Sequence, residues 1–192
     1  APSSSEPFSL KTYAGYLPHT LRVNDIWIQQ PVTGSEQRLA IQGEGSAEKY
    51  QLRVNTLQGP LTSLWASVVP AQQDFTAQLA FTEAAGGIVG GLLSLPGDTV
   101  LSAQLDAQAD VNGAIQVKNG QVQIGTFRTQ LQGGYVVDSG ALDVQANFVA
   151  ADMVMVQALS GTPISGSATG GISLKGTPDA LQVRSEEHTS EL

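Results

Sequence analysis

The side chains that could support catalysis or bind a metal are few and far apart in the sequence. His19 is the only histidine before residue 188, and the chain contains no cysteine. A thiol nucleophile and a cysteine-ligated zinc are therefore excluded, and a single histidine gives little support for general-base or metal chemistry. No Gly-x-Ser-x-Gly, His-Glu-x-x-His or P-loop pattern is present.

Two glycine-containing stretches resemble catalytic motifs in part. Gly171-Ile-Ser-Leu-Lys175 begins like a nucleophile elbow but ends in Lys where that motif needs Gly. Gly86-Gly-Ile-Val-Gly-Gly91 is not followed by the Lys-Ser or Lys-Thr that would hold phosphate, so we expect a bend or a flat strand there. The sequence therefore predicts no enzyme, no catalytic residue, no metal site and no cofactor.

The composition indicates a folded chain with a restricted choice of partners. Its 192 residues carry a formal net charge of −8, which argues against nucleic acid as a partner. Hydrophobic residues make up 41% and charged residues 14%, which is too apolar for a disordered chain. No stretch approaches the roughly 20 apolar residues of a membrane-spanning helix, and the first residues do not form a signal peptide.

An alternation of apolar and polar residues runs through most of the chain and predicts β-strands. In the clearest run, from Leu101 to Val111, the odd positions are apolar and the even positions are Ser, Gln and Asp. The two sets of side chains would face opposite sides of a sheet. Asp106 and Asp110 would then share the polar face, where we interpret them as solvated side chains rather than an acid–base pair.

Turn residues divide the chain into roughly ten to twelve short strands. Asn112-Gly113 and Asn119-Gly120 each predict a hairpin turn, because Asn-Gly accepts the positive φ values of such turns. Helix is expected at Ala151–Leu159, where Asp152 suits the first turn, and helical spacing also occurs between Leu61 and Val68. The predicted fold class is all-β: an elongated, curled, antiparallel repeat sheet with at most one or two short helices. A β-sandwich or a β-solenoid is the alternative.

The apolar face of such a sheet needs a cover, because apolar area removed from water contributes roughly 25 cal/mol per Å². A second sheet or a closed core would supply that cover from the protein itself. An open trough would instead be covered in part by a ligand with acyl chains. The candidate ligand-binding residues act collectively and come from three apolar runs: Leu101, Ala103, Leu105, Ala107, Leu142, Val144, Ala146, Phe148, Ile172 and Leu174.

The segment from Ala151 to Ala180 resembles the repeat unit of a known family. It starts with Ala-Asp and a short apolar stretch, passes through Pro-Ile-Ser-Gly and a strand, and ends in Gly-Thr-Pro, a turn that also occurs at Gly161. Residues 38–45 and 50–60 are similar to further repeats of this kind. The pattern resembles AsmA-like proteins, in particular the TamB (translocation and assembly module) group of diderm bacteria. Leu181 departs from it, because that family often has Pro there.

The resemblance implies a function as well as a fold. Proteins of this group are anchored in the inner membrane and cross the periplasm as a long, curled β-sheet with a hydrophobic groove. The group is associated with moving phospholipids to the outer membrane, and with assembly of outer-membrane proteins beside a barrel partner. On this reading the chain is a periplasmic slice of the rod, without the membrane anchor, and phospholipid acyl chains are its ligand.

The end of the chain differs in character from all that precedes it. Residues 184–192 read RSEEHTSEL, with no alternation of apolar and polar residues. They match the translation of a common sequencing adapter at every position, so we interpret them as a non-native tail rather than a disordered acidic one. The expected organisation is a disordered start at 1–7, a β-repeat groove segment at 8–183 and the tail at 184–192.

Two other kinds of β-protein share the alternating pattern. A structural or adhesive β-repeat protein would have a closed core and carry no lipid. An outer-membrane barrel would turn its apolar residues outward between two girdles of aromatic side chains. The aromatic content is only 6%, without paired girdles, which argues against the barrel.

Overall fold

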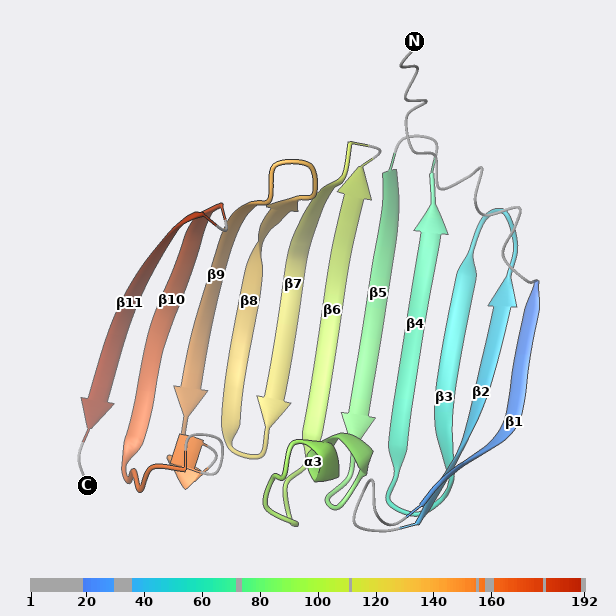
Figure 1. Ribbon diagram of the computed structural model, residues 1–192, viewed down its shortest axis with the longest axis horizontal. Helices are drawn as coiled ribbons and strands as arrows, with labels where there is room; N and C mark the ends of the chain where they lie inside the picture. Colours follow the sequence, from blue (N-terminus) through green and yellow to red (C-terminus); the bar gives the residue numbers. More distant parts are fainter. Residues whose placement is uncertain are drawn as a thin grey trace.

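The computed structural model describes residues 19–29, 36–71, 74–110, 112–154, 156–157, 161–177 and 179–190. They form eleven strands and the short helix α3 (Figure 1). The expected disordered start at 1–7 lies outside the described residues. The elements are β1 (Thr20–Ile28), β2 (Gln37–Gly45), β3 (Tyr50–Gln58), β4 (Thr62–Pro70), β5 (Asp74–Glu83), α3 (Ile88–Leu92), β6 (Leu101–Asp110), β7 (Ala114–Ile124), β8 (Phe127–Val136), β9 (Ala141–Ala150), β10 (Ser167–Thr177) and β11 (Ala180–Ser190).

The strands form one antiparallel sheet whose spatial order follows the sequence from β1 to β11. Each strand pairs with the strand before it and the strand after it, so β1 and β11 are the two edges of the sheet (Figure 1). Most connections are short turns built by turn-forming residues. At the β6–β7 turn, for example, Gly113 has a φ of 76°, and its N–H donates to the carbonyl oxygen of Asp110 at 3.2 Å.

The pairing register places most of the apolar residues of the strands on one face. Across the middle of the sheet, Leu105 pairs with Gly120, Gly120 with Leu131, Leu131 with Ala146 and Ala146 with Ile172. Because directly paired residues point to the same side of a sheet, this row joins β6 to β10 through one apolar face. The polar residues between these positions form the opposite face.

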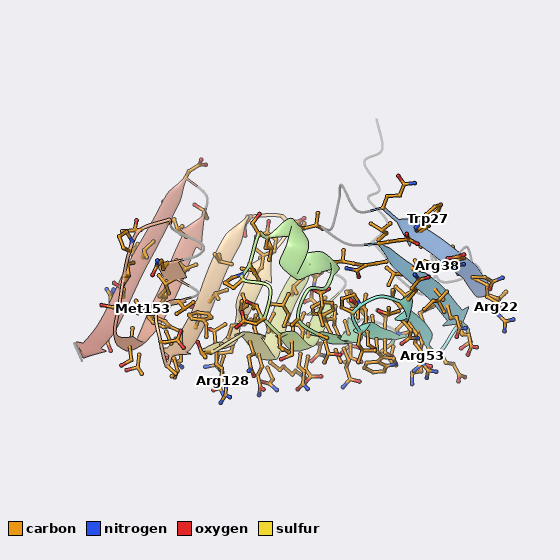
Figure 2. All side chains as sticks on the ribbon, turned by 90° about the horizontal axis from the view of Figure 1, so that it is seen from below. Arg22, Trp27, Arg38, Arg53, Arg128 and Met153 are labelled. Atoms are coloured by element: carbon orange, nitrogen blue, oxygen red, sulfur yellow. The ribbon has the colours of Figure 1, made fainter. Side chains whose placement is uncertain are left out.

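The sheet is a curved single layer, and its apolar face is the concave one. Figure 2 shows Arg53 and Arg128, which belong to the polar set, projecting from the convex side. Helix α3 lies on the concave side. The right-handed twist of strands makes a broad sheet coil in this way.

Little of the described chain is fully buried. The buried hydrophobic residues all lie on the concave face: Leu39, Leu101, Ala109, Ala150 and Ala168. Most other residues on this face are only half-buried, because no second layer of described residues packs against the sheet. The open curled sheet is therefore confirmed, and the sandwich and solenoid alternatives are wrong for the described residues.

Two sequence-based expectations about local structure are wrong. Residues from Leu61 to Val68 do not form a helix but belong largely to β4, where Leu64 and Val68 pair with β5. Asn119-Gly120 does not form a hairpin turn. It lies inside β7, where the pairing with β6 and β8 shifts between Val117 and Gly120. These residues therefore form a β-bulge instead of a turn.

Among the described residues, helix occurs in two short stretches. The glycine-rich segment expected to be a bend or a flat strand instead contains α3. In the expected helix at 151–159, Val154, Val156 and Gln157 are helical, and residues 155 and 158–159 lie outside the described residues. Asp152 does cap this turn, because its carboxylate accepts a hydrogen bond from the backbone N–H of Val154 at 3.1 Å.

Candidate functional site

The structure brings the ten candidate residues together on the concave face. Four lie on β6, four on β9 and two on β10, and the register of the intervening strands places all of them on one side. Leu101 is buried, whereas Leu105 and Val144 are half-buried and Ile172 is 37% exposed. These side chains form a shared apolar surface that remains accessible from the concave side.

Strands β7 and β8 fill the space between the candidates with residues that sequence analysis did not select. Val117, Val122, Phe127 and Leu131 lie on the same face as Leu105. The rings of Phe127 and Phe148 stack at 6.0 Å between centroids, with an interplanar angle of 21°. The alternation of apolar and polar residues in 114–124 and 127–136 could have identified the residues of β7 and β8, but the bulge and Gly133 interrupt this pattern.

Glycines on this face let large side chains from neighbouring strands lie flat against the sheet. A Cβ atom at Gly120 would stand 2.5 Å from Cγ of Leu131, and one at Gly170 would stand 2.9 Å from the ring of Phe148. These contacts are too close for any residue other than glycine. At these two positions the side chains of Leu131 and Phe148 therefore lie over the backbone of the neighbouring strand.

The apolar face continues through the first five strands, which were not candidates. The residues that extend it from β2 to β5 pair across the sheet in the same way as those of β6 to β10. They include Ile41, Leu52, Val54, Leu64, Ala66, Leu79 and Phe81. The apolar surface therefore spans the full width of the sheet.

Charged groups are concentrated on the convex face and the rims. Lys175 and Asp143 form an ion pair at 2.9 Å, and the amide of Gln78 donates to Asp106 at 3.0 Å. Asp25 and Arg38 form a second exposed pair. The hydrogen bond from Arg38 lowers the pKa of the Asp25 carboxyl group, and the same contact raises the pKa of Arg38. Such exposed pairs contribute little to stability.

One charged residue lies on the concave face. At the paired positions of β1 to β10, Glu83 is the one acidic or basic residue in register with the apolar set: it pairs with Leu101 on one side and Thr62 on the other. Its side chain is 1% exposed and lies beneath α3. Sequence analysis missed Glu83, although its place in the series Phe75, Ala77, Leu79, Phe81 would have shown it.

The remaining residues with catalytic potential do not form a site. The exposed ring of His19 lies 3.2 Å from the carbonyl oxygen of Gly45, measured from Nδ1. Ser173 lies within β10, so it is not on the strand-to-helix turn of a nucleophile elbow. Among the described residues there is no group of His, Asp and Glu side chains that could hold a metal ion. No helix in that part of the chain has the length and apolar character needed to span a membrane.

A hollow of about 780 Å³ lies over one end of β7, β8, β9 and β10. Much of its lining comes from the polar set, including Gln116, Gly134, Asp143 and Lys175. Gly134 carries no side chain, which leaves space between Gln116 and Asp143. Leu142, one of the ten candidate residues, also lines this hollow.

Comparison with known proteins identifies no relative. No protein family, no curated protein and no solved structure matches the chain.

Proposed function

We propose that the chain is a segment of a lipid-conducting β-groove protein, whose concave face holds the acyl chains of phospholipids. The observation that supports this proposal best is the apolar surface that crosses all eleven strands, over which the described residues form no second sheet. In a monomeric protein of ordinary design a second layer would cover such a surface. Contiguous exposed apolar areas of this kind mark binding sites for apolar partners.

Acyl chains fit the shape and the chemistry of this face. They are flexible hydrocarbons, and they need neither hydrogen bonds nor counter-ions from the protein. The face offers Leu, Val, Ile, Phe and Ala side chains over a floor containing glycine. Burial of apolar area contributes roughly 25 cal/mol per Å², so many weak contacts together would hold a chain while no single residue is essential.

The resemblance to the AsmA-like and TamB proteins supports a more specific proposal. The segment would lie in the periplasm as part of a longer protein that is anchored in the inner membrane. It would pass phospholipids between the inner and outer membranes, or support assembly of outer-membrane proteins through parts of the protein that contact a barrel partner.

The competing proposal is a structural or adhesive β-repeat protein that carries no lipid. It requires the concave face to be closed by protein. Within the described residues α3 and its flanking loops lie on that face at one end of the sheet (Figure 2), and no second sheet covers it. We therefore favour the lipid groove.

Photo-crosslinking with a matched pair of faces tests the proposed function. A photoreactive amino acid is placed at Leu142 or Val144 in one set, and at Asp143 or Gln145 in the other, in the chain exported to the periplasm of a diderm host. Phospholipid adducts are expected at the first set only, because the two sets point to opposite faces of β9. Adducts at neither set, or equally at both, would show that the concave face is not a lipid groove.

A further inference from the structure

The connection between β5 and β6 covers part of the concave face (Figure 2). Its residues 84–97 include α3 and carry no charged side chain. Figure 2 shows α3 on the concave side, and Figure 1 shows it at the end of the sheet where β5 finishes and β6 begins. Leu92 and Leu93, at the end of α3, are 59% and 50% exposed.

The carboxylate of Glu83 fixes this connection to the sheet. Its Oε1 accepts a hydrogen bond from the backbone N–H of Gly90 at 2.8 Å, and its Oε2 accepts one from the N–H of Val89 at 3.0 Å. The hydroxyl of Thr62 donates to Oε2 at 3.2 Å. A buried carboxylate is stable only with such partners, and two of its three partners belong to α3.

Two further contacts hold the segment at the same end of the sheet. The side-chain amide of Gln37, which is fully buried, donates to the carbonyl oxygen of Gly86 at 3.3 Å. The N–H of Ala84 donates to the carbonyl oxygen of Leu61 at 2.8 Å. The backbone at Gly87 passes so near Glu83 that a Cβ atom there would lie 2.2 Å from Cγ of that residue.

We propose that residues 84–97 form a plug across one end of the apolar groove, and that Glu83 is the latch that keeps the plug closed. The Glu83 carboxylate loses its hydration when it is buried. Hydrogen bonds from α3 replace that hydration, and they exist only while α3 packs against the sheet. The plug prevents acyl chains from passing between α3 and the sheet. When the hydrogen bonds between Glu83 and α3 break, that end of the groove opens. The role in lipid passage rests on the proposed function, whereas the latch itself does not.

Glu83→Gln is the decisive change, because it keeps the size of the side chain and removes one acceptor. The amide oxygen can accept from Val89 or from Gly90, and the amide nitrogen then faces the other N–H. Amide hydrogen exchange, measured by NMR on the full chain, should become about tenfold faster at Val89 and Gly90. Exchange in the central strands should stay unchanged.

The control is Asp98→Asn, which removes a charge at an exposed position of the same connection. It should leave exchange at Val89 and Gly90 as in the wild type. If Glu83→Gln unfolds the chain, Thr62→Val removes a single hydrogen bond to Oε2 and should give a smaller acceleration at the same two amides. Unchanged exchange at Val89 and Gly90 in folded Glu83→Gln, or in Thr62→Val, would overturn the latch.

A second readout separates the latch from the lipid function. Phe75 and Phe81 lie on the concave face at opposite ends of β5, and each accepts a photoreactive phenylalanine with little change of shape. In the wild type we expect phospholipid adducts at Phe75 and few at Phe81, and Glu83→Gln should raise the yield at Phe81 severalfold. Faster exchange without adducts at either position would support the latch and contradict the lipid groove. A yield at Phe81 that already equals that at Phe75 in the wild type would overturn the plug.

Discussion

At the scale of single residues, the concave face depends on glycines that no other residue can replace. Gly133 has a φ of 153°, and a Cβ atom there would lie 2.3 Å from the carbonyl oxygen of Asp143. We expect Gly133→Ala to lower the free energy of unfolding by about 2 kcal/mol, because strain and a backbone clash act together. Urea denaturation measures this change.

Gly97→Ala is the matched control for this prediction. A Cβ atom at Gly97 would have nothing within 4 Å, and its φ lies outside the left-handed region. We expect its effect to stay within about 0.5 kcal/mol. Equal effects of the two substitutions would contradict the close approach of β8 and β9 at Gly133.

Asp110 provides a prediction about pH. Hydrogen bonds from the backbone N–H groups of Ala114 and Asn112, both at 2.9 Å, lower the pKa of its carboxyl group below the usual 3.8. The carboxylate therefore stabilises the β6–β7 turn above pH 3.8, and this contribution is lost as the pH falls through the lowered pKa. Asp110→Ala should have a lower Tm than the wild type at pH 7, and the gap should narrow below pH 3.8. A gap that does not change with pH would show that the charge is irrelevant to the turn.

At the scale of elements, periodicity in the sequence predicted most strands, but it did not predict the bulge in β7 or the helix α3. The alternation in 101–111 and 141–148 predicted β6 and β9, and Asn112-Gly113 predicted the turn after β6. Asn119-Gly120 led to a wrong prediction of a turn. Pairing with β6 and β8 on both sides of β7 outweighs the local turn preference of these two residues. Helix α3 has no periodicity to reveal it: the carboxylate of Glu83 holds it in place, and that contact is not visible in the sequence.

Strand β11 contains both the end of the alternating sequence and the start of the residues interpreted as a non-native tail. Leu181 and Val183 pair with Gly176 and Leu174 on the apolar face, and the next position in that register is Ser185. The apolar pattern thus ends at the point where the residues interpreted as a non-native tail begin. Removal of 184–192 should change the free energy of unfolding by less than about 1 kcal/mol, because it removes no large apolar side chain from β11 at a described position.

A shorter truncation product provides the comparison. A chain that ends at Thr177 also lacks Leu181 and Val183, and it should be clearly less stable than a chain that ends at Val183. Thermal unfolding of the two truncated chains beside the full chain measures both effects. If the two truncations were equally destabilising, the tail would be an integral part of the sheet, and its interpretation as non-native would lose support.

At the scale of the whole molecule, the site is a property of the register rather than of any motif. The sequence predicted the apolar face within each strand, as for Leu105 on β6 and Ile172 on β10. It could not show that these two residues share one face, because that depends on every turn and bulge between them. It also could not show that the face stays uncovered, because the presence of a second layer is a question of tertiary structure.

The uncovered face gives the last prediction. A ligand that binds only the folded state stabilises it, and a lysophospholipid at about 100 times its Kd would add about 2.7 kcal/mol, or roughly 5–10 °C in Tm for a chain of this size. We expect this rise in the wild type and in Gln145→Val, which changes the convex face. Val144→Gln should show a smaller rise, because it places an amide among the acyl chains. A closed core would respond differently: the lipid would leave Tm unchanged or lower it, and Val144→Gln would destabilise the protein even without lipid.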